Sequence, residues 1–468
     1  MSKQSSVKRG AVPRGLTVAL AGLRAGGALA VDGAVQQVLA RSGLRSVEAG
    51  SEFSRREARR FVAELGRLKG TYVKIGQMFA LLGEHFLPPV LTEALHDLGG
   101  STEPLPWSAI KPVVNRELGN KHRDLQIEPE AFAAASLAQV HRATISATDE
   151  DIVCKIQYPG LADVIDADFD AVVRMLKLAR WLPAGRDLDD WLGSMRVHLH
   201  HEIDYYREAH FAQGMAAHID ALGESGAIFH VPEVYPEYSS QRVLALEYID
   251  GKSVNDAAVA RLSLKRRNAL AQAMLELFFI ELYAWGVLQT DPNFGNYLIQ
   301  TARPGSGDRD RLVLLDFGSM LECSDDFLYH LRRVIAAGLE EDKDTLISGL
   351  VGLGCLKPDA DEEAHQLFSD FCLHLLEPLR EPSRLPTEHL NRRGEYRWGD
   401  SRLMQRAGKL AAANSTSKHF TTPSRDFALI ARKLTGVFTF IAVLDAQFNG
   451  YELVMKHIQR WREQDTHG

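Results

Sequence analysis

The sequence has few cysteines, no long uncharged run and no excess of positive charge, and each shortage excludes a class of protein. Its 468 residues include four cysteines, far apart and without a CxxC pair. Neither a disulfide framework nor a thiolate metal site is therefore expected, which fits a reducing, cytoplasmic setting. The longest stretch without a charged residue, Thr345–Leu356, is well short of the roughly 18 apolar residues of a transmembrane helix. No membrane span is predicted.

Charge and composition exclude two further classes. Acidic residues outnumber basic ones, 61 against 54, for a formal net charge of −7, so the chain has no global attraction for phosphate backbones and no nucleic-acid partner is expected. Hydrophobic residues make up 45% and charged residues 25%, which is typical of a folded globular protein and excludes a disordered one.

The first 50 residues are predicted to form a separate segment that could lie on a membrane surface. Basic residues precede the apolar run Gly15–Leu23, and Arg24 interrupts that run before Ala25–Val31. This pattern favours a weakly amphipathic, peripheral helix. A secretory signal is the alternative.

Periodicity and breakers divide the remainder into three segments. Residues 51–105 are predicted to be a helical extension, with one long amphipathic helix over Arg55–Leu82. Residues 106–247 combine a β-hairpin within Phe132–Gln157 and a helix over Arg196–Leu222. Residues 248–468 are mostly helical, and Glu377–Asp400, rich in Pro and Arg, is predicted to be a long exposed loop.

The strongest chemical signal is the run QTDPNFGN at 289–296, followed after a predicted hairpin by DFG at 316–318. Mg²⁺ prefers oxygen ligands, and the Asp316 carboxylate and Asn296 amide oxygen supply them. Asp291 lies five residues before Asn296, the spacing of the catalytic aspartate and metal-binding asparagine in kinases. It could orient or deprotonate an attacking hydroxyl or water. The combination predicts phosphoryl transfer.

A second cluster concerns a lysine at the end of a predicted strand. Lys155 ends the run IVCK, where its ammonium group could reach the α- and β-phosphates of a nucleotide. Glu208, on the following predicted helix, is the expected carboxylate partner. The alternative is a surface ion pair that contributes little.

The segment upstream of that lysine is unusual for a kinase. A glycine-rich loop is expected there, yet residues 131–136 are AFAAAS. Alanine keeps backbone N–H groups available to phosphates but disfavours the positive φ angles that glycine adopts. A stiffer loop of different shape is expected, unless the alanines are simply structural.

A third cluster has no counterpart in an ordinary kinase. Lys74 and Gln77, in the sequence KIGQ on the predicted N-terminal helix, share a face at i, i+3 spacing and could cover a pocket. Gly66, Gly70 and Gly76 should each weaken a helix by roughly 1 kcal/mol and suggest close packing. A solvated polar face with packing glycines is the alternative.

These motifs together resemble those of the UbiB family of atypical kinase-like ATPases, also called aarF-domain kinases. The shared motifs are KxGQ at 74–77, AAAS at 133–136, ExD at 202–204, QTDPNFGN at 289–296 and DFG at 316–318. The Gln-Thr-Asp-Pro form resembles the branch associated with coenzyme Q biosynthesis.

The resemblance implies an α+β, protein-kinase-like bilobal fold with a small β-containing N-lobe, a helical C-lobe and an added N-terminal helical extension. It implies Mg²⁺-dependent binding of ATP or ADP, with quinone-like lipids, membrane surfaces or lipid-biosynthetic enzymes as partners. Lys74 and Gln77 would lie over the active site, where Glu202 and Asp204 would meet Lys74. The loop residues Ala133, Ala134, Ala135 and Ser136 would contact the nucleotide together with Lys155.

Three functions stay open at this point. An atypical kinase or ATPase in isoprenoid-quinone metabolism is favoured. A conventional protein kinase is disfavoured by the covering KxGQ helix and by the lack of an APE segment after Asp316. A nucleotide-gated scaffold would need the same metal and lysine positions without any chemistry.

Overall fold

The computed structural model of the protein describes residues 48–68, 70–82, 87, 89–96, 98, 103–178, 182, 186–303, 309–414 and 424–465. The predicted peripheral helix before residue 48 lies outside these residues. The chain divides into two units, Met1–Ala209 with Val234–Tyr248, and His210–Glu233 with Ile249–Gly468. The boundaries expected near residues 105 and 247 stay predictions.

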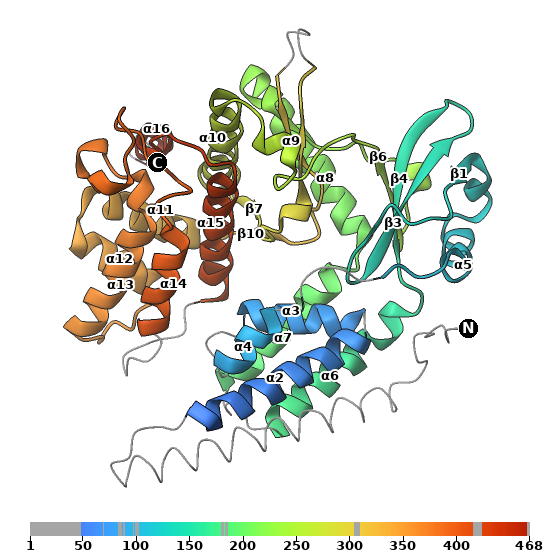
Figure 1. Ribbon diagram of the computed structural model, residues 1–468, viewed down its shortest axis with the longest axis horizontal. Helices are drawn as coiled ribbons and strands as arrows, with labels where there is room; N and C mark the ends of the chain where they lie inside the picture. Colours follow the sequence, from blue (N-terminus) through green and yellow to red (C-terminus); the bar gives the residue numbers. More distant parts are fainter. Residues whose placement is uncertain are drawn as a thin grey trace. The chain divides into compact units, whose positions relative to one another are not determined.

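The first unit contains a group of helices around one apolar core. Its members are α2 (Glu48–Leu68), α3 (Thr71–Leu82), α4 (Pro89–His96), α6 (Leu161–Leu178) and α7 (Arg186–His201) (Figure 1). The single helix predicted over Arg55–Leu82 is wrong, because the chain breaks between α2 and α3. Gly70 lies at the break with φ +62°, a conformation that glycine adopts without steric cost.

The first unit also contains an antiparallel sheet. Its strands run in the order β1 (Leu125–Ile127), β3 (Ala138–Ile145), β4 (Glu150–Gln157) and β6 (Val243–Glu247), with β2 (Ala133–Ala134) paired to β3. The predicted hairpin is confirmed by the pairing of β3 with β4. Helix α5 (Trp107–Leu118) packs on one face and shares a core with alternate residues of β4, including Ile152 and Cys154.

The second unit is built around α10 (Leu264–Ile280), which continues into a π-helical turn at Glu281–Trp285. Two short ladders follow in the chain. Strand β7 (Val287–Gln289) pairs with β10 (Met320–Glu322), and β8 (Tyr297–Gln300) pairs with β9 (Arg311–Leu314), both antiparallel. The latter is the predicted hairpin, and β5 (Phe229–His230) joins it alongside β9.

The remainder of the second unit is helical. It comprises α9 (Ala257–Ala260), α11 (Asp325–Glu340), α12 (Lys343–Gly352), α13 (Glu362–Leu375), α14 (Leu403–Asn414), α15 (Arg425–Val443) and α16 (Tyr451–Asp465). Helix α15 lies alongside α10 (Figure 1). Across the described ranges, no helix combines the length and apolar character needed to cross a membrane.

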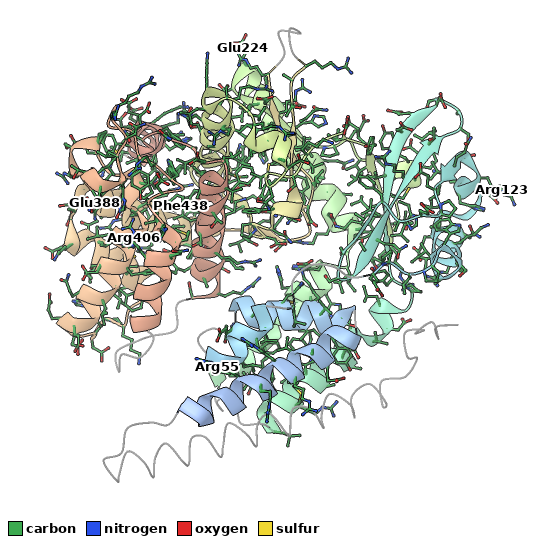
Figure 2. The ribbon with its side chains drawn as sticks, viewed as in Figure 1. Arg55, Arg123, Glu224, Glu388, Arg406 and Phe438 are labelled. Carbon is green, nitrogen blue, oxygen red and sulfur yellow. The ribbon has the colours of Figure 1, made fainter. Side chains whose placement is uncertain are left out.

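The segment Glu377–Asp400 is a loop with short 3-10 turns, as predicted, but it is not exposed along its whole length. Tyr396 and Trp398 are 0% and 3% exposed, and the Glu377 carboxylate accepts hydrogen bonds from the Tyr396 hydroxyl and the Arg406 guanidinium. The Trp398 ring packs edge-on against Phe438, 5.2 Å away between centroids; Figure 2 labels Arg406 on α14 and Phe438 on α15. Prolines end the helical pattern in this segment, but the aromatic side chains of Tyr396 and Trp398 are buried.

Candidate active site

Lys155 on β4 forms an ion pair with Glu208 in the first turn of α8 (Tyr205–Asp220). Lys155 Nζ lies 2.7 Å from Glu208 Oε1, and Glu208 is only 2% exposed. The ammonium group also lies 5.3 Å from the centre of the Tyr205 ring. This is not the solvent-exposed pair considered as an alternative. Breaking it would leave a buried carboxylate without its cation.

Lys74 on α3 forms a second ion pair, with Glu202. The distance from Lys74 Nζ to Glu202 Oε1 is 2.6 Å, and the two side chains are 15% and 16% exposed. The helix predicted over Arg196–Leu222 is wrong, because α7 ends at His201 and α8 begins at Tyr205. Glu202 therefore lies in a turn rather than on a helix face.

Asp204, the second acidic residue of the ExD motif, has a different position. Its Oδ1 accepts a hydrogen bond of 3.2 Å from the backbone amide of Arg207, which caps the first turn of α8. That helix carries Glu208. The two acidic residues of the motif therefore have different contacts. Glu202 pairs with Lys74, and Asp204 caps α8, whose Glu208 pairs with Lys155.

The KxGQ residues also fix how α3 packs against the end of α4. Gln77 Nε2 donates to the Leu98 carbonyl oxygen at 3.1 Å. A Cβ on Gly76 would lie 2.3 Å from Leu98 Cδ1, so a larger residue there would displace the Leu98 side chain. That Gln77 and Lys74 cover an active site stays a prediction.

The alanine-rich segment is extended. Ala133 and Ala134 form β2, which pairs with Val140 and Gln139. The Ala135 amide donates to the Ala138 carbonyl at 2.8 Å, and within the described residues 131–138 no φ is positive. The segment is therefore a tight hairpin and not a glycine-type loop. Its contact with a nucleotide stays a prediction.

In the second unit, strand register brings the two expected metal ligands together. Tyr297 is paired with Leu314 across β8 and β9, which places Asn296 opposite the chain entering the DFG motif. The Leu315 amide donates to the Asn296 carbonyl at 3.0 Å. Asn296 and Asp316 are therefore neighbours because both flank one hairpin.

The hydrogen bonds around Asn296 and Asp316 suit a magnesium ion. Asn296 Nδ2 donates to the Asp291 carbonyl at 3.0 Å and to Asp291 Oδ2 at 3.2 Å, so the amide nitrogen faces the acceptors and the amide oxygen is left for a cation. Asp316 Oδ1 accepts from the Gly318 amide at 2.9 Å, which orients the carboxylate. One carboxylate and one amide oxygen, completed by phosphates and water, are a usual Mg²⁺ environment.

Sequence reasoning missed two residues of α15 that contact the QTDPNFGN loop. Arg432 donates to Asp291 Oδ1 at 2.6 Å, and Lys433, 1% exposed, hydrogen-bonds Gln289 and Tyr297. A signal was present for Lys433, since it occupies an apolar-face position between Ile430 and Leu434. Arg432 gave no comparable signal.

The histidine-rich end of α7 forms no metal site. His198 Nε2 lies 3.7 Å from Glu202 Oε1 and His200 Nε2 lies 3.1 Å from Asp166 Oδ1. Throughout the part of the chain that the structure describes, no three His, Cys, Asp or Glu side chains are placed to hold a metal ion together. Burial raises the pKa of the Cys154 thiol beside Lys155 to about 12, so it is an unreactive core residue.

Comparisons with known proteins agree with the motifs. Residues 97–349 match the model of the ABC1 atypical kinase-like domain. The chain is 27% identical to the probable serine/threonine-protein kinase abkA of Dictyostelium discoideum over 87% of the chain and 71% of that protein. It is 30% identical to the mitochondrial atypical kinase coq-8 of Caenorhabditis elegans over 84% of the chain and 50% of the relative. For the mitochondrial atypical kinase COQ8 of Saccharomyces cerevisiae the identity is 29%, over 69% of the chain and 62% of the relative.

The fold is shared with a solved structure. A chain from Mycobacterium tuberculosis, described as the complex of Rv3197 with erythromycin, superposes with a TM-score of 0.58 at 22% identity, covering 88% of this chain and 98% of that one. The predicted α+β, kinase-like fold is confirmed. The chain spans between 50% and 71% of the length of the three relatives above.

Proposed function

The chain belongs to the ABC1 atypical kinase-like family, which confirms the resemblance to UbiB proteins, and on that premise we propose that it binds Mg·ATP and transfers or hydrolyses its terminal phosphate in isoprenoid-quinone metabolism. The observation that carries this proposal is the hydrogen-bonded set of Asp291, Asn296 and Asp316 in the second unit. The quinone branch is supported by the coq-8 and COQ8 relatives.

Each residue of the set has a role that its contacts support. Asn296 and Asp316 would hold Mg²⁺, whose charge offsets that of the phosphates when it is bound. The Asp291 carboxylate, oriented by Arg432 and Asn296, would position the attacking hydroxyl or water. In the first unit, Lys155 would contact nucleotide phosphates, and Glu208 would hold the ammonium group in place.

The first test is nucleotide binding. The thermal unfolding of the wild type and of Asp316→Asn is measured with and without Mg·ATP. At 100 times the dissociation constant, ATP should add about 2.7 kcal/mol to the free energy of unfolding of the wild type. The variant should lose this gain. Equal shifts in both proteins would contradict the assignment of Asp316 as a metal ligand.

A second test separates an enzyme from a nucleotide-gated scaffold. Asp291→Asn should abolish ATP turnover while leaving the Mg·ATP-induced thermal shift in place, because Asp291 is not expected to ligate the metal. Turnover is assayed with and without quinone-like lipids and vesicles. Absence of turnover in the wild type under all these conditions, with nucleotide binding intact, would favour the scaffold. Efficient phosphorylation of added proteins would favour a conventional kinase.

A further inference from the structure

A buried ion pair contacts the QTDPNFGN loop, and one of its two members, Lys433, lies in a part of the chain that the family model does not reach. Lys433 on α15 and Glu281 in the π-helical turn after α10 are each 1% exposed, with Lys433 Nζ 3.4 Å from Glu281 Oε2. Residues 97–349 match the family model, so α15 lies outside the match. Buried charges of this kind are costly unless paired and hydrogen-bonded.

The hydrogen bonds of this pair converge on Gln289, the first residue of the loop. Lys433 Nζ donates to Gln289 Oε1 at 3.2 Å and to the Tyr297 hydroxyl at 3.1 Å, and the Tyr297 hydroxyl donates to Gln289 Oε1 at 3.0 Å. The backbone amide of Gln289 hydrogen-bonds Glu281. Gln289 is therefore held through both its backbone and its side chain.

Gln289 in turn holds the backbone of Asp291. With Oε1 occupied by two donors, its amide nitrogen must face an acceptor, and Nε2 donates to the Asp291 carbonyl at 2.7 Å. The same carbonyl accepts from Asn296. A chain of hydrogen bonds thus runs from Lys433 through Gln289 to the peptide group of Asp291.

The backbone of α15 also approaches the loop closely. A Cβ on Gly436 would lie 2.0 Å from Pro292 Cβ, so only glycine permits this packing one turn after Lys433. The π-helical turn is the corresponding irregularity on α10, and such widened turns often mark functional sites. Each helix therefore has an irregular feature where it contacts the loop, Gly436 on α15 and the π-helical turn after α10.

We propose that Lys433 is a positioning residue, which sets the conformation of residues 289–296 through Gln289 and thereby aligns Asp291 and Asn296. The expected effect of Lys433 on ATP turnover rests on the proposed function. The structural consequence, a loop ordered by Lys433, is independent of any activity.

The test compares Lys433→Met, the double variant Lys433→Met with Glu281→Gln, and a control. The control is Lys456→Met, which removes an exposed lysine of α16 that is paired with Glu276 of α10. Lys433→Met alone should unfold at a clearly lower temperature, because Glu281 is left buried without its cation. Burial raises the pKa of Glu281, and Lys433 opposes that rise. The double variant removes both charges and should recover most of the lost melting temperature.

Two readouts then distinguish positioning from simple stabilisation. In the double variant, amide hydrogen exchange over residues 289–297 should be faster than in the wild type while exchange in α10 is unchanged. Its kcat for ATP should fall on the order of tenfold or more, with little change in KM. Wild-type exchange in the loop of a double variant with recovered melting temperature would overturn the proposal.

A milder variant covers the case in which the double variant does not fold. Gln289→Met keeps the ion pair between Lys433 and Glu281 and removes the side-chain amide that joins Lys433 to the Asp291 carbonyl. Faster exchange over residues 289–296 at a near wild-type melting temperature supports the proposal, and unchanged exchange overturns it. If the wild type shows no ATP turnover, the proposed function fails, but the exchange measurement still decides the role of Lys433.

Discussion

Arg432 on α15 holds the carboxylate of Asp291, with 2.6 Å between Arg432 Nη2 and Asp291 Oδ1. Asn296 donates to the other carboxylate oxygen at 3.2 Å. Asp291, which is proposed to orient the attacking group, is thus held by two side chains. One of them, Arg432, lies 141 residues later in the chain.

Replacing Arg432 with alanine should lower kcat for ATP on the order of tenfold, because Asp291 loses one of its two orienting partners. Steady-state turnover of the variant and of the wild type measures the effect. Arg425→Ala, at the start of the same helix, is the control for loss of a positive charge from α15. Equal turnover in Arg432→Ala and the wild type would show that the contact does not orient Asp291 for the reaction.

The packing around Leu98 predicts opposite effects at two glycines, Gly76 on α3 and Gly66 on α2. Gly76→Ala should lower the free energy of unfolding by about 1 kcal/mol, because its Cβ would overlap Leu98 and the cost of overpacking exceeds the gain in helix propensity. Gly66→Ala, whose Cβ would lie 3.6 Å from Leu98, should raise it by up to about 1 kcal/mol. Urea unfolding of both variants checks the order. A stabilised Gly76→Ala would contradict the close approach.

Lys74 and Glu202 should stabilise the fold through the interaction between their two charges. Glu202→Gln should lower the free energy of unfolding by on the order of 1 kcal/mol, since both side chains are mostly buried. Lys74→Met should cost a similar amount, and the double variant Lys74→Met with Glu202→Gln should lose less than the sum of the two single losses. Denaturant unfolding of the two single variants and the double variant gives the coupling. Additive losses would mean that the two charges do not interact.

The network around Glu377 predicts a dependence on acid. Burial alone would raise the pKa of Glu377, but hydrogen bonds from Arg406 and Tyr396 lower it overall. A carboxylate with a lowered folded-state pKa contributes stability above its usual pKa of about 4.3, and this contribution is lost as the pH falls through the folded-state value. The advantage of the wild type over Glu377→Gln should therefore be full at pH 7 and shrink below about pH 4.3.

Urea unfolding at several pH values checks this dependence. Glu381→Gln, which alters a half-exposed carboxylate with a longer contact to Arg384, is the control and should show a smaller difference from the wild type at every pH. A difference between the wild type and Glu377→Gln that does not change with pH would contradict the ionised network.

Local patterns were enough to predict the elements that carry the motifs. The β3–β4 and β8–β9 hairpins were predicted from short apolar runs around polar breaks, and their antiparallel register then brings Asn296 beside Asp316. The ion pair of Lys155 with Glu208 was expected from motif order and is present at 2.7 Å. The functional roles of these residues stay predictions.

Local sequence patterns failed to predict where two helices break. Apolar spacing runs through Gly70 and through Glu202–Asp204 without interruption, yet the chain turns at both places. Helix periodicity measures which residues face a core and is insensitive to a break that keeps the same face buried. At Glu377–Asp400 the prolines indicated a loop correctly, but exposure was decided by Tyr396 and Trp398, which bury against later helices.

By itself, the sequence determined the family, the fold class and the order of the motifs, because these depend on local residue type and spacing. Only the tertiary structure decided that α15 supplies Arg432 and Lys433 to the QTDPNFGN loop. Contacts between residues so distant in the chain depend on how α15 packs against α10, and a lysine on an apolar helix face does not reveal which buried carboxylate or amide it will meet.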